Sequence, residues 1–358
     1  MLYTVTSFMK AVSKQSTIYD VAHLAGVSSA TVSRFLNEPD RVAPDKREKI
    51  RSAIKELNFV PKAEAVAKAR RAYKRIGVVA PFFTQPSFME RLRGIEEILS
   101  GEHYELVLYA IDTEEELENY VQMLINTQRV DGLIFLCLKL GEDLLELLDS
   151  APFPLCFVEA EYENFDCVVV QNLQGGQKAA EYLYKRGCRK PGFIGEISTR
   201  KFSVAATEER FRGFQFYFAN QGLVIPKERV WLGTFSECDR EEAISSFLEQ
   251  EDLPDGIFCS SDVLAASLIR IAEKKGISVP EKIKVIGFDN IDIADYLSLT
   301  SVSQNLDESG MMAARLVLDR IADRQRGITT MKVGLKIIER ETCGERLLPC
   351  NAANAEFF

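Results

Sequence analysis

Histidine is nearly absent from this sequence, and so are the spacings that bind metals. The chain has two histidines in 358 residues, and its eight cysteines are scattered without a Cys-x-x-Cys pair. Zinc sites need Cys and His ligands at short, regular spacings, so we predict neither a metal centre nor any other cofactor. Most of the cysteines lie in apolar stretches such as LIFLCL and PLCFVE, which predicts buried free thiols.

Long apolar runs and catalytic signatures are missing as well. No stretch of about eighteen apolar residues occurs, which argues against a membrane-spanning helix. The N-terminal segment MLYTVTSFMKAVSKQS lacks the apolar core and cleavage site of a secretory signal, so we expect a cytoplasmic protein. There is no Gly-x-Ser-x-Gly motif and no Walker-type phosphate loop, and we predict that the chain is not an enzyme.

Charge is distributed unevenly along the chain. The net charge is −9, yet residues 1–75 carry fifteen Lys and Arg against seven Asp and Glu. The remaining residues hold 29 basic and 46 acidic side chains. A basic head on an acidic body indicates that the head alone approaches a polyanion such as DNA.

Three short helices are predicted in the basic head. Thr17 and Asp20 have the spacing of an approximate capping box, and Gly26 is suited to end the helix that they begin. A second helix is predicted over residues 29–36 and a third over residues 44–57. Val21, Leu24 and Ala25 are expected on the inner face of the first helix, with the polar side of the second helix left outward.

Such an outward helix fits the DNA major groove, where its N-terminal side chains reach base edges. Ser29 and Ala30 are small enough for close approach, and Arg34 can donate two hydrogen bonds to guanine. Thr31 and Ser33 are better placed for phosphates, which orient the protein without specifying a sequence. The alternative is a three-helix packing module whose basic surface is incidental.

A long motif favours the DNA-binding interpretation. Thr17–Asn37 has the pattern T-I-x-D-V-A-x-x-A-G-V-S-x-x-T-V-S-R-x-L-N, and RSAIKELNFVP continues it to Pro61. Both segments resemble the signature of the LacI/GalR family of bacterial regulators. The resemblance implies a head that contacts operator DNA, with contacts from Thr17, Tyr19, Ser28, Ser29, Ala30, Thr31, Ser33, Arg34, Asn37, Lys62, Ala65 and Lys68.

The segment 62–75 departs from the family pattern. Members place a valine and a DNA-wedging leucine where this chain has Glu64 and Lys68. Lys68 and its basic neighbours are expected to hold the minor groove by charge. Alternatively, Val66 serves as a smaller wedge after a register shift, or the segment is a linker without a DNA role.

From residue 76 onward, short β-rich runs alternate with helical patterns. This alternation predicts parallel sheets covered by helices on both faces, and its length predicts two lobes rather than one sheet. Ligands of open α/β sheets bind beyond the carboxyl ends of the strands, which places a site in the cleft between lobes. The body resembles the core of the same family, which is similar to periplasmic sugar-binding proteins.

The resemblance implies a set of effector-binding residues: Phe83, Gln85, Phe88, Glu159, Arg210, Phe235, Ser261, Asp262 and Asp289. Arg210 and Asp289 match the ligand-clamping charges, and Phe235 matches an aromatic platform. Phe82 and Glu159 depart from the usual residues, so the usual sugar does not follow. An arginine, an aspartate and an aromatic ring together suit a polyhydroxylated ligand, although such residues are often an interlobe salt bridge and a core phenylalanine.

These features predict a repressor with a small all-α helix-turn-helix head and a two-lobed α/β core with parallel sheets. The expected divisions are a disordered arm (1–16), a DNA-binding domain (17–61), a hinge (62–75), a ligand-binding and dimerisation core (76–343) and a tail (344–358). The expected partners are palindromic double-stranded operator DNA, a carbohydrate-like effector and a second copy of the chain, because one head covers only half a site. The alternative is a core that responds allosterically to a partner protein.

Overall fold

A computed structural model describes most of the chain. It describes residues 16–37, 39–57, 59, 73–234 and 237–344. Contacts divide the chain into one unit at residues 1–74 and a second at residues 75–358, here called the head and the body. Each unit is considered separately below.

The head contains three helices and a short 3-10 turn. The elements are α1 (Ile18–Ala25), α2 (Ser29–Asn37), η1 (Pro39–Arg41) and α3 (Pro44–Glu56). Thr17 and Asp20 form a full capping box at the start of α1. Gly26 follows α1 in the left-handed conformation, with φ of 65°, which glycine adopts without a steric penalty. The predicted helices of the head are therefore present.

A small shared core holds the head together. Val21, Val32 and Ile50, one from each α-helix, are completely buried. Leu24 was expected on this inner face but is 44% exposed, and Ala22 is buried in its place. The inner face of α1 therefore consists of Val21, Ala22 and Ala25. These residues lie within about one turn of the helix.

The first lobe of the body is built on an all-parallel sheet. Its strand order is β11-β5-β4-β3-β1-β2. In sequence order these strands are β1 (Arg75–Ala80), β2 (Glu105–Ala110), β3 (Gly132–Leu136), β4 (Leu155–Val158), β5 (Asp166–Val169) and β11 (Thr330–Lys332). The helices of this lobe are α5 (Pro86–Gly101), α6 (Glu114–Thr127), α7 (Glu142–Asp149) and α13 (Leu306–Ala322).

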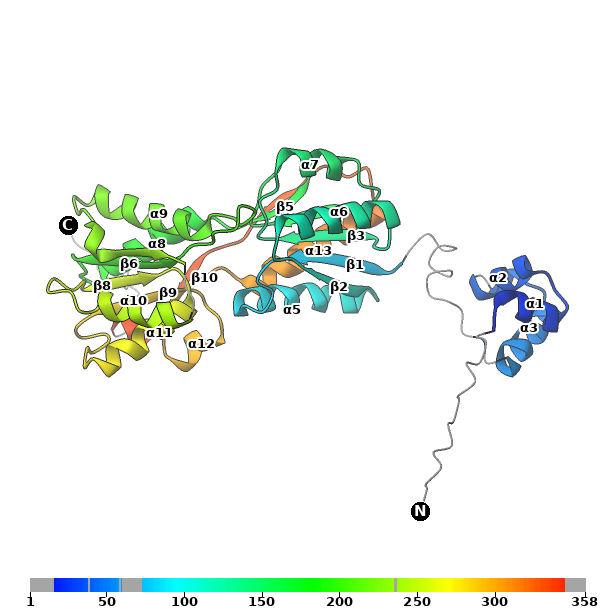
Figure 1. The fold of residues 1–358 in the computed structure, drawn as a ribbon, viewed down its shortest axis with the longest axis horizontal. Helices are drawn as coiled ribbons and strands as arrows, with labels where there is room; N and C mark the ends of the chain where they lie inside the picture. Colours follow the sequence, from blue (N-terminus) through cyan, green and yellow to red (C-terminus); the bar gives the residue numbers. More distant parts are fainter. Residues whose placement is uncertain (1–15, 38, 58, 60–72, 235–236, 345–358) are drawn as a thin grey trace, which may run out of the picture. The chain divides into compact units, whose positions relative to one another are not determined.

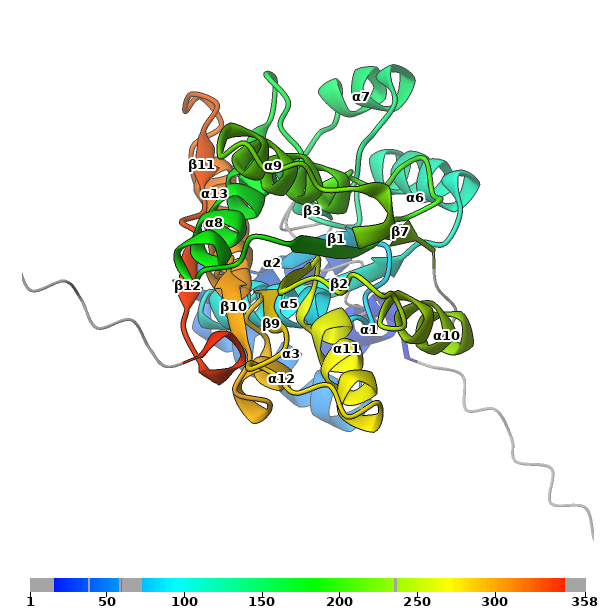
Figure 2. The same cartoon turned by 90° about the vertical axis from the view of Figure 1, so that its left-hand side faces the viewer.

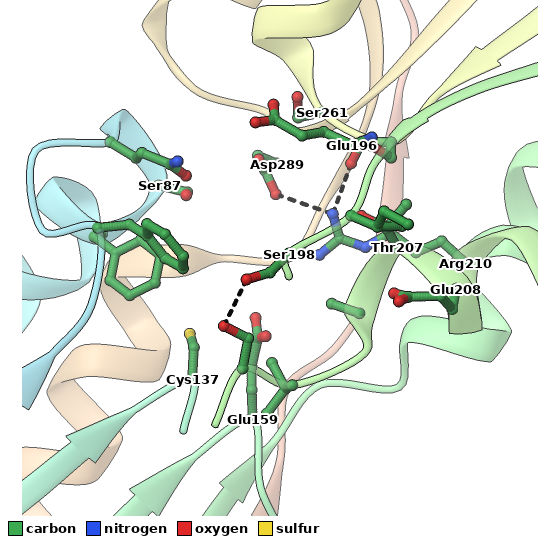
Figure 3. Close-up of a pocket in the computed structure, with 18 of the residues that line it drawn as sticks. Ser87, Cys137, Glu159, Glu196, Ser198, Thr207, Glu208, Arg210, Ser261 and Asp289 are labelled. Atoms are coloured by element: carbon green, nitrogen blue, oxygen red, sulfur yellow. Dashed lines mark hydrogen bonds and ion pairs between the residues drawn. The ribbon is translucent and has the colours of Figure 1, made fainter. Parts of the chain in front are cut away.

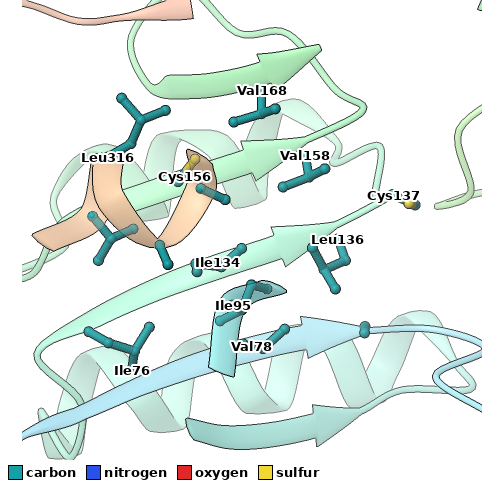
Figure 4. Close-up of a cluster of buried hydrophobic side chains, with 14 of the residues drawn as sticks. Ile76, Val78, Ile95, Ile134, Leu136, Cys137, Cys156, Val158, Val168 and Leu316 are labelled. Atoms are coloured by element: carbon teal, nitrogen blue, oxygen red, sulfur yellow. The ribbon is translucent and has the colours of Figure 1, made fainter. Parts of the chain in front are cut away.

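Both faces of the first sheet are covered. On one face Ile76, Ile134 and Cys156 pack against Ile95 of α5 and Leu316 of α13 (Figure 4). On the other face, alternate residues of the same strands pack against α6 and α7. Strands buried on both faces read as continuous apolar runs, which explains stretches such as LIFLCL.

The second lobe repeats this plan with a mixed sheet. Its order is β12-β10-β9-β8-β6-β7, and only β12 runs antiparallel to its neighbour among the pairs described. The strands are β6 (Pro191–Glu196), β7 (Val230–Gly233), β8 (Gly256–Cys259), β9 (Lys284–Asp289), β10 (Thr300–Ser303) and β12 (Lys336–Ile338). The helices and 3-10 turns are α8 (Asn172–Lys185), α9 (Ala206–Asn220), η2 (Lys227–Arg229), α10 (Glu237–Phe247), α11 (Asp262–Lys274), α12 (Asp292–Tyr296) and η3 (Glu341–Cys343).

The helices of the second lobe also lie on two faces. α8 and α9 pack on one face through residues such as Leu183 and Phe214. α10 and α11 pack on the other through Ile244 and Leu268. Figures 1 and 2 show these layers from two directions. The predicted two-lobed α/β fold is confirmed, although the alternation did not predict the strands β7, β10, β11 and β12.

The chain passes between the lobes at several separate points. It crosses after β5, returns to the first lobe after β10, and crosses again between β11 and β12. Gln304 lies in the second of these connections, between β10 and α13. The connections join the two lobes, and the second of them brings Gln304 to the cleft.

Candidate functional site

A polar cavity of about 310 Å³ lies between the two lobes. Its walls carry the carboxylates Glu159, Glu196, Glu208 and Asp289 and the guanidinium groups Arg91, Arg200 and Arg210. Hydroxyl groups of Ser87, Ser198, Thr207 and Ser261 also line it (Figure 3). Phe82 and Phe88 supply aromatic surface from the first lobe. The cavity lies beyond the carboxyl ends of the strands, as expected for an α/β fold.

Arg210 and Asp289 meet at the second-lobe side of the cavity. Arg210 Nη1 lies 3.8 Å from Asp289 Oδ1. The Arg210 side chain also donates hydrogen bonds to Asn172 Oδ1 at 2.8 Å and to the Ser260 carbonyl at 2.7 Å. Its guanidinium carbon lies 3.7 Å from the ring centroid of Phe288. These contacts hold the guanidinium group in one orientation at the cleft.

A second arginine–carboxylate pair faces it from the first lobe. Arg91 of α5 pairs with Glu159, which follows β4, and their side chains are only 2% and 4% exposed. Arg91 also donates to Gln304 Oε1 at 3.2 Å, and Gln304 Nε2 donates to Asp289. Gln304 therefore links the two pairs across the cleft.

The four buried charges influence one another. Burial lowers the pKa of Arg210 despite its attraction to Asp289 and Glu159. Burial raises the pKa of Asp289, against the effect of the two arginines. Burial opposes the charge of Arg91, but the nearby carboxylates outweigh it and the pKa is raised. Two cations and two anions balance here, which limits the cost of removing them from water.

Asp262 lies behind Asp289 and is itself completely buried. Its Oδ1 accepts from the Ser301 hydroxyl at 2.6 Å, and its Oδ2 accepts from the Ile291 backbone N–H at 3.0 Å. Asp289 and Asn290 both have positive φ, at 107° and 58°, which is strained for residues other than glycine. Asp262 and Ser301 thus support the turn that directs Asp289 into the cavity.

A loop of the second lobe is anchored in the first. This loop, residues 197–205 between β6 and α9, is called the strap. Phe202 of the strap is 5% exposed and packs in the first-lobe core. Its carbonyl accepts from the Lys139 N–H at 2.8 Å. Arg200 pairs with Asp112 at 2.9 Å and lies over the Phe82 ring at 4.3 Å. The strap therefore bridges the lobes beside the cavity.

Most of the predicted effector residues lie together at this cavity. Six of them line it: Gln85, Phe88, Glu159, Ser261, Arg210 and Asp289. Phe83 does not line it and is 36% exposed, while its neighbour Phe82 faces the cavity instead. Asp262 lies behind the wall rather than in it. Phe235 is outside the described residues.

Several important residues were missed from the sequence. Arg91 lies on the apolar stripe of α5, three residues after Phe88 and four before Ile95, and a charge at such a position indicates a buried partner. Gln304, Asn172 and the strap gave no comparable signal, because their roles depend on how the lobes meet.

In the head, the predicted DNA-contacting side chains lie mainly on the surface of α1 and α2. Tyr19 is 72% exposed. Ala30 and Arg34 are exposed, and Ser29 and Ser33 are half-buried. Ser28 caps α2 by accepting from the Thr31 N–H at 3.2 Å. Exposed or half-buried polar groups on one short helix are suited to a DNA groove.

Some predicted DNA-binding positions lie outside the structural description. Lys62, Ala65 and Lys68 fall in residues 60–72, which are not described, and the side chain of Asn37 is also outside it. Glu64 and Val66 belong to the same segment. All three interpretations of that segment, including a linker without a DNA role, therefore stay predictions.

No group of three or more His, Cys, Asp or Glu side chains in the part of the chain that the structure describes is arranged to hold a metal ion. No helix in the described ranges combines the length and apolar character needed to cross a membrane.

A helix-turn-helix unit followed in sequence by a two-lobed α/β unit with a polar cleft defines a class of DNA-binding regulatory proteins. Comparisons with protein families agree. Residues 17–62 match the model of bacterial regulatory proteins of the lacI family. Residues 180–343 match a periplasmic binding protein-like domain.

Characterised relatives cover nearly the whole chain. An HTH-type transcriptional repressor PurR of Vibrio atlanticus is 33% identical over 334 residues, which is 91% of this chain and 98% of the relative. The PurR repressor of Haemophilus influenzae strain PittEE is 33% identical over 319 residues, covering 87% and 93%. The chain belongs to the lacI family of bacterial regulatory proteins. The prediction of a regulator rather than an enzyme is confirmed by this membership.

Solved structures share the fold. A Lacl-family transcriptional regulator of Silicibacter pomeroyi is 26% identical with a TM-score of 0.78, covering 92% of this chain and all of that one. The regulator CelR in complex with cellobiose is 27% identical with a TM-score of 0.66, at 92% and 100% coverage. A lac repressor dimer bound to operator has a TM-score of 0.78 at 22% identity and 93% and 100% coverage, which supports the fold alone.

Proposed function

We propose that this chain is a homodimeric transcriptional repressor whose affinity for operator DNA is set by a small polyhydroxylated effector bound between the lobes. The observation that carries the proposal is the polar cavity lined by arginine and carboxylate side chains, in a chain that begins with a lacI-family head. Charged groups make strong, directional hydrogen bonds to hydroxyl groups. The PurR relatives are repressors by name, and we propose that this chain acts in the cytoplasm, where a bacterial regulator meets its DNA.

The proposed divisions follow the sequence prediction. Residues 17–61 bind DNA, residues 62–75 connect the units, and residues 76–343 bind the effector and dimerise. Within the head, Ser29, Ala30 and Arg34 read bases. The flanking residues Thr17, Tyr19, Ser28, Thr31, Ser33, Asn37, Lys62, Ala65 and Lys68 bind the backbone or the minor groove.

In the body, Arg210 and Asp289 bind hydroxyl groups of the effector. Glu159, Gln85, Phe88 and Ser261 contribute from the surrounding wall, and Phe235 is proposed as an aromatic platform. Effector binding changes the angle between the lobes and thereby the fit of two heads to DNA. Coupling of this kind is about 1–3 kcal/mol and acts equally in both directions.

Dimerisation is supported by exposed apolar side chains in both lobes. Met89 of α5 is 51% exposed, and Tyr296 and Leu297 at the end of α12 are 84% and 38% exposed. Figure 1 draws both helices along the lower edge of the body. We propose that this edge contacts a second copy. Sedimentation should show a monomer for Tyr296→Glu and a dimer for the control Ile328→Glu, which also alters an exposed apolar residue.

Two measurements test the proposed function. Selection of bound sequences from random duplex DNA should recover a palindrome with two half-sites, and no preference over bulk DNA would overturn the proposal. Calorimetry of the full chain with sugars, polyols and nucleobases should identify an effector class. Binding that Asp289→Ala abolishes supports the cavity as the site, whereas silence across the panel favours control by a partner protein.

A further inference from the structure

The two lobes contain a short internal repeat at the cleft. Residues 91–94 read Arg-Leu-Arg-Gly, and residues 210–213 read Arg-Phe-Arg-Gly. The first copy lies on α5, the helix after the first strand of lobe one, and the second lies on α9, the helix after the first strand of lobe two. The repeat thus occupies the same topological position in each lobe.

Helix packing shows that the first arginines of the two copies are structurally equivalent. A Cβ added to Gly310 of α13 would lie 2.1 Å from the Arg91 carbonyl oxygen. A Cβ added to Gly176 of α8 would lie 1.9 Å from the Arg210 carbonyl oxygen. In each lobe a glycine of the neighbouring helix therefore contacts the backbone of the cleft arginine. Both arginines therefore lie at the contact between the two helices that cover the same face of their sheet.

The carboxylate partners are equivalent as well. Glu159 directly follows β4, and Asp289 is the last residue of β9. β4 and β9 hold the same third position in the strand orders of their sheets. Both residues have positive φ, at 67° and 107°. Each carboxylate is thus turned from the end of its strand toward the arginine of its own lobe.

The two pairs differ in how completely the arginine is bonded. Arg210 Nε donates to Asn172 Oδ1 at 2.8 Å. Arg91 Nε is buried and has no hydrogen-bond partner in the described part of the chain. A buried donor without an acceptor is costly, and the cost is removed when a bound molecule, or a shift of the side chain toward it, supplies the acceptor.

We propose that Arg91 and Glu159 form the first-lobe half of the effector site, as the counterpart of Arg210 and Asp289 in the second lobe. The inference rests on the proposed small-molecule function and adds a requirement on the ligand. Each half offers a guanidinium donor beside a carboxylate acceptor. The ligand therefore carries a neighbouring acceptor and donor at each of two opposite ends, as adjacent hydroxyl groups of a polyol do, or the amide edges of a heterocycle.

The test variant removes both charges of the first-lobe pair at once. A single substitution would leave one buried charge without a partner, whereas removing both partners of a buried pair is often neutral for stability. The variant is Arg91→Met with Glu159→Gln in the full chain, compared with Arg210→Met with Asp289→Asn. The second arginines of the repeat provide matched controls, since Arg93 and Arg212 are exposed on the same helices. The controls are Arg93→Met and Arg212→Met.

Affinity is measured by calorimetry with D-ribose, cellobiose and uracil, and folding by thermal unfolding of each variant. For a probe that binds the unaltered protein, both double variants should lose about tenfold or more in affinity, because each loses hydrogen bonds to charged groups. Both controls should bind as before. Tighter binding of a sugar probe would indicate a polyol ligand, and tighter binding of uracil would indicate a heterocycle.

Three results would overturn the inference in different ways. If the Arg210 and Asp289 double variant loses binding while the Arg91 and Glu159 double variant keeps it, the inference fails and the proposed function stands. If the unaltered protein binds none of the probes, the small-molecule function fails and the inference fails with it. If the Arg91 and Glu159 double variant does not unfold cooperatively, Arg91→Lys, which keeps the charge of the buried pair, provides the milder test. Unchanged affinity in that variant also overturns the inference.

Discussion

The head and the body place their functional residues in different ways. In the head, every described residue proposed to touch DNA lies between Thr17 and Asn37, on helices held by a small core. In the body, the hydrogen-bonded Arg91 and Gln304 are 213 positions apart in the sequence. The head displays its proposed DNA-binding groups on the surface, whereas the body buries the arginine and aspartate side chains Arg91, Arg210 and Asp289 of its cleft site.

The head and the body should therefore respond differently to substitution. Substituting an exposed polar side chain on a short helix changes stability little. The residue type at such a position can therefore be set by the DNA sequence that it contacts. A buried charge must be paired, so each such residue in the body constrains several others. Substitutions in the head should therefore change either DNA binding or the structure of the head alone. Substitutions among the buried charges of the body should change stability and effector binding together.

The largest loss of stability is expected for Phe202→Ala in the strap. This side chain is 5% exposed within the first-lobe core, and removing a buried aromatic ring typically costs about 3–5 kcal/mol. Chemical unfolding should show that loss in the body, and X-ray scattering should show more open lobes. Stability within about 0.5 kcal/mol of the unaltered protein would contradict the anchoring role.

Ile50→Ala should destabilise the head alone. Ile50 is completely buried in the head core, and such truncations cost about 2–5 kcal/mol, a large fraction of the stability of a small unit. Hydrogen exchange should increase throughout α1–α3, while exchange in the body sheets stays unchanged. Equal acceleration in both units would contradict their independence.

Arg34→Ala should alter DNA selectivity without altering stability. The side chain is exposed, and loss of a two-pronged contact to guanine reduces discrimination by about 1–3 kcal/mol. Competition between operator and random duplexes should show weaker preference, with salt-sensitive binding retained. Unchanged selectivity would remove Arg34 from the base-reading residues.

Asp262→Asn should have its smallest effect near pH 4, a growing one as the pH rises to about 8, and a constant one above that. Burial, with repulsion from Asp289, raises the pKa of Asp262 to about 8. The folded state therefore keeps a proton that the unfolded state loses near pH 4, and stability falls as pH rises between these values. The Asn variant should lack this component of the decline. Parallel stability profiles for the two proteins would contradict the assignment.

The sequence predicted the head helices and the α/β alternation because these depend on neighbouring residues. The capping box at Thr17 and the left-handed Gly26 are local features. It predicted Arg210 and Asp289 as cleft residues through motif resemblance, and the structure brings them together. It placed Phe83 in the cleft where Phe82 lies, because the direction of a side chain in a loop depends on tertiary contacts.

By itself, the amino-acid sequence determined the order of elements, the basic head, the strands buried on both faces and the family of the protein. Only the tertiary structure decided that Arg91 faces Arg210, that Gln304 links Arg91 to Asp289, and that Phe202 of one lobe is buried in the other. The reason is physical: helices and strands form from short-range periodicity and capping, whereas a buried charge finds its partner only when strand order and crossovers bring distant segments together.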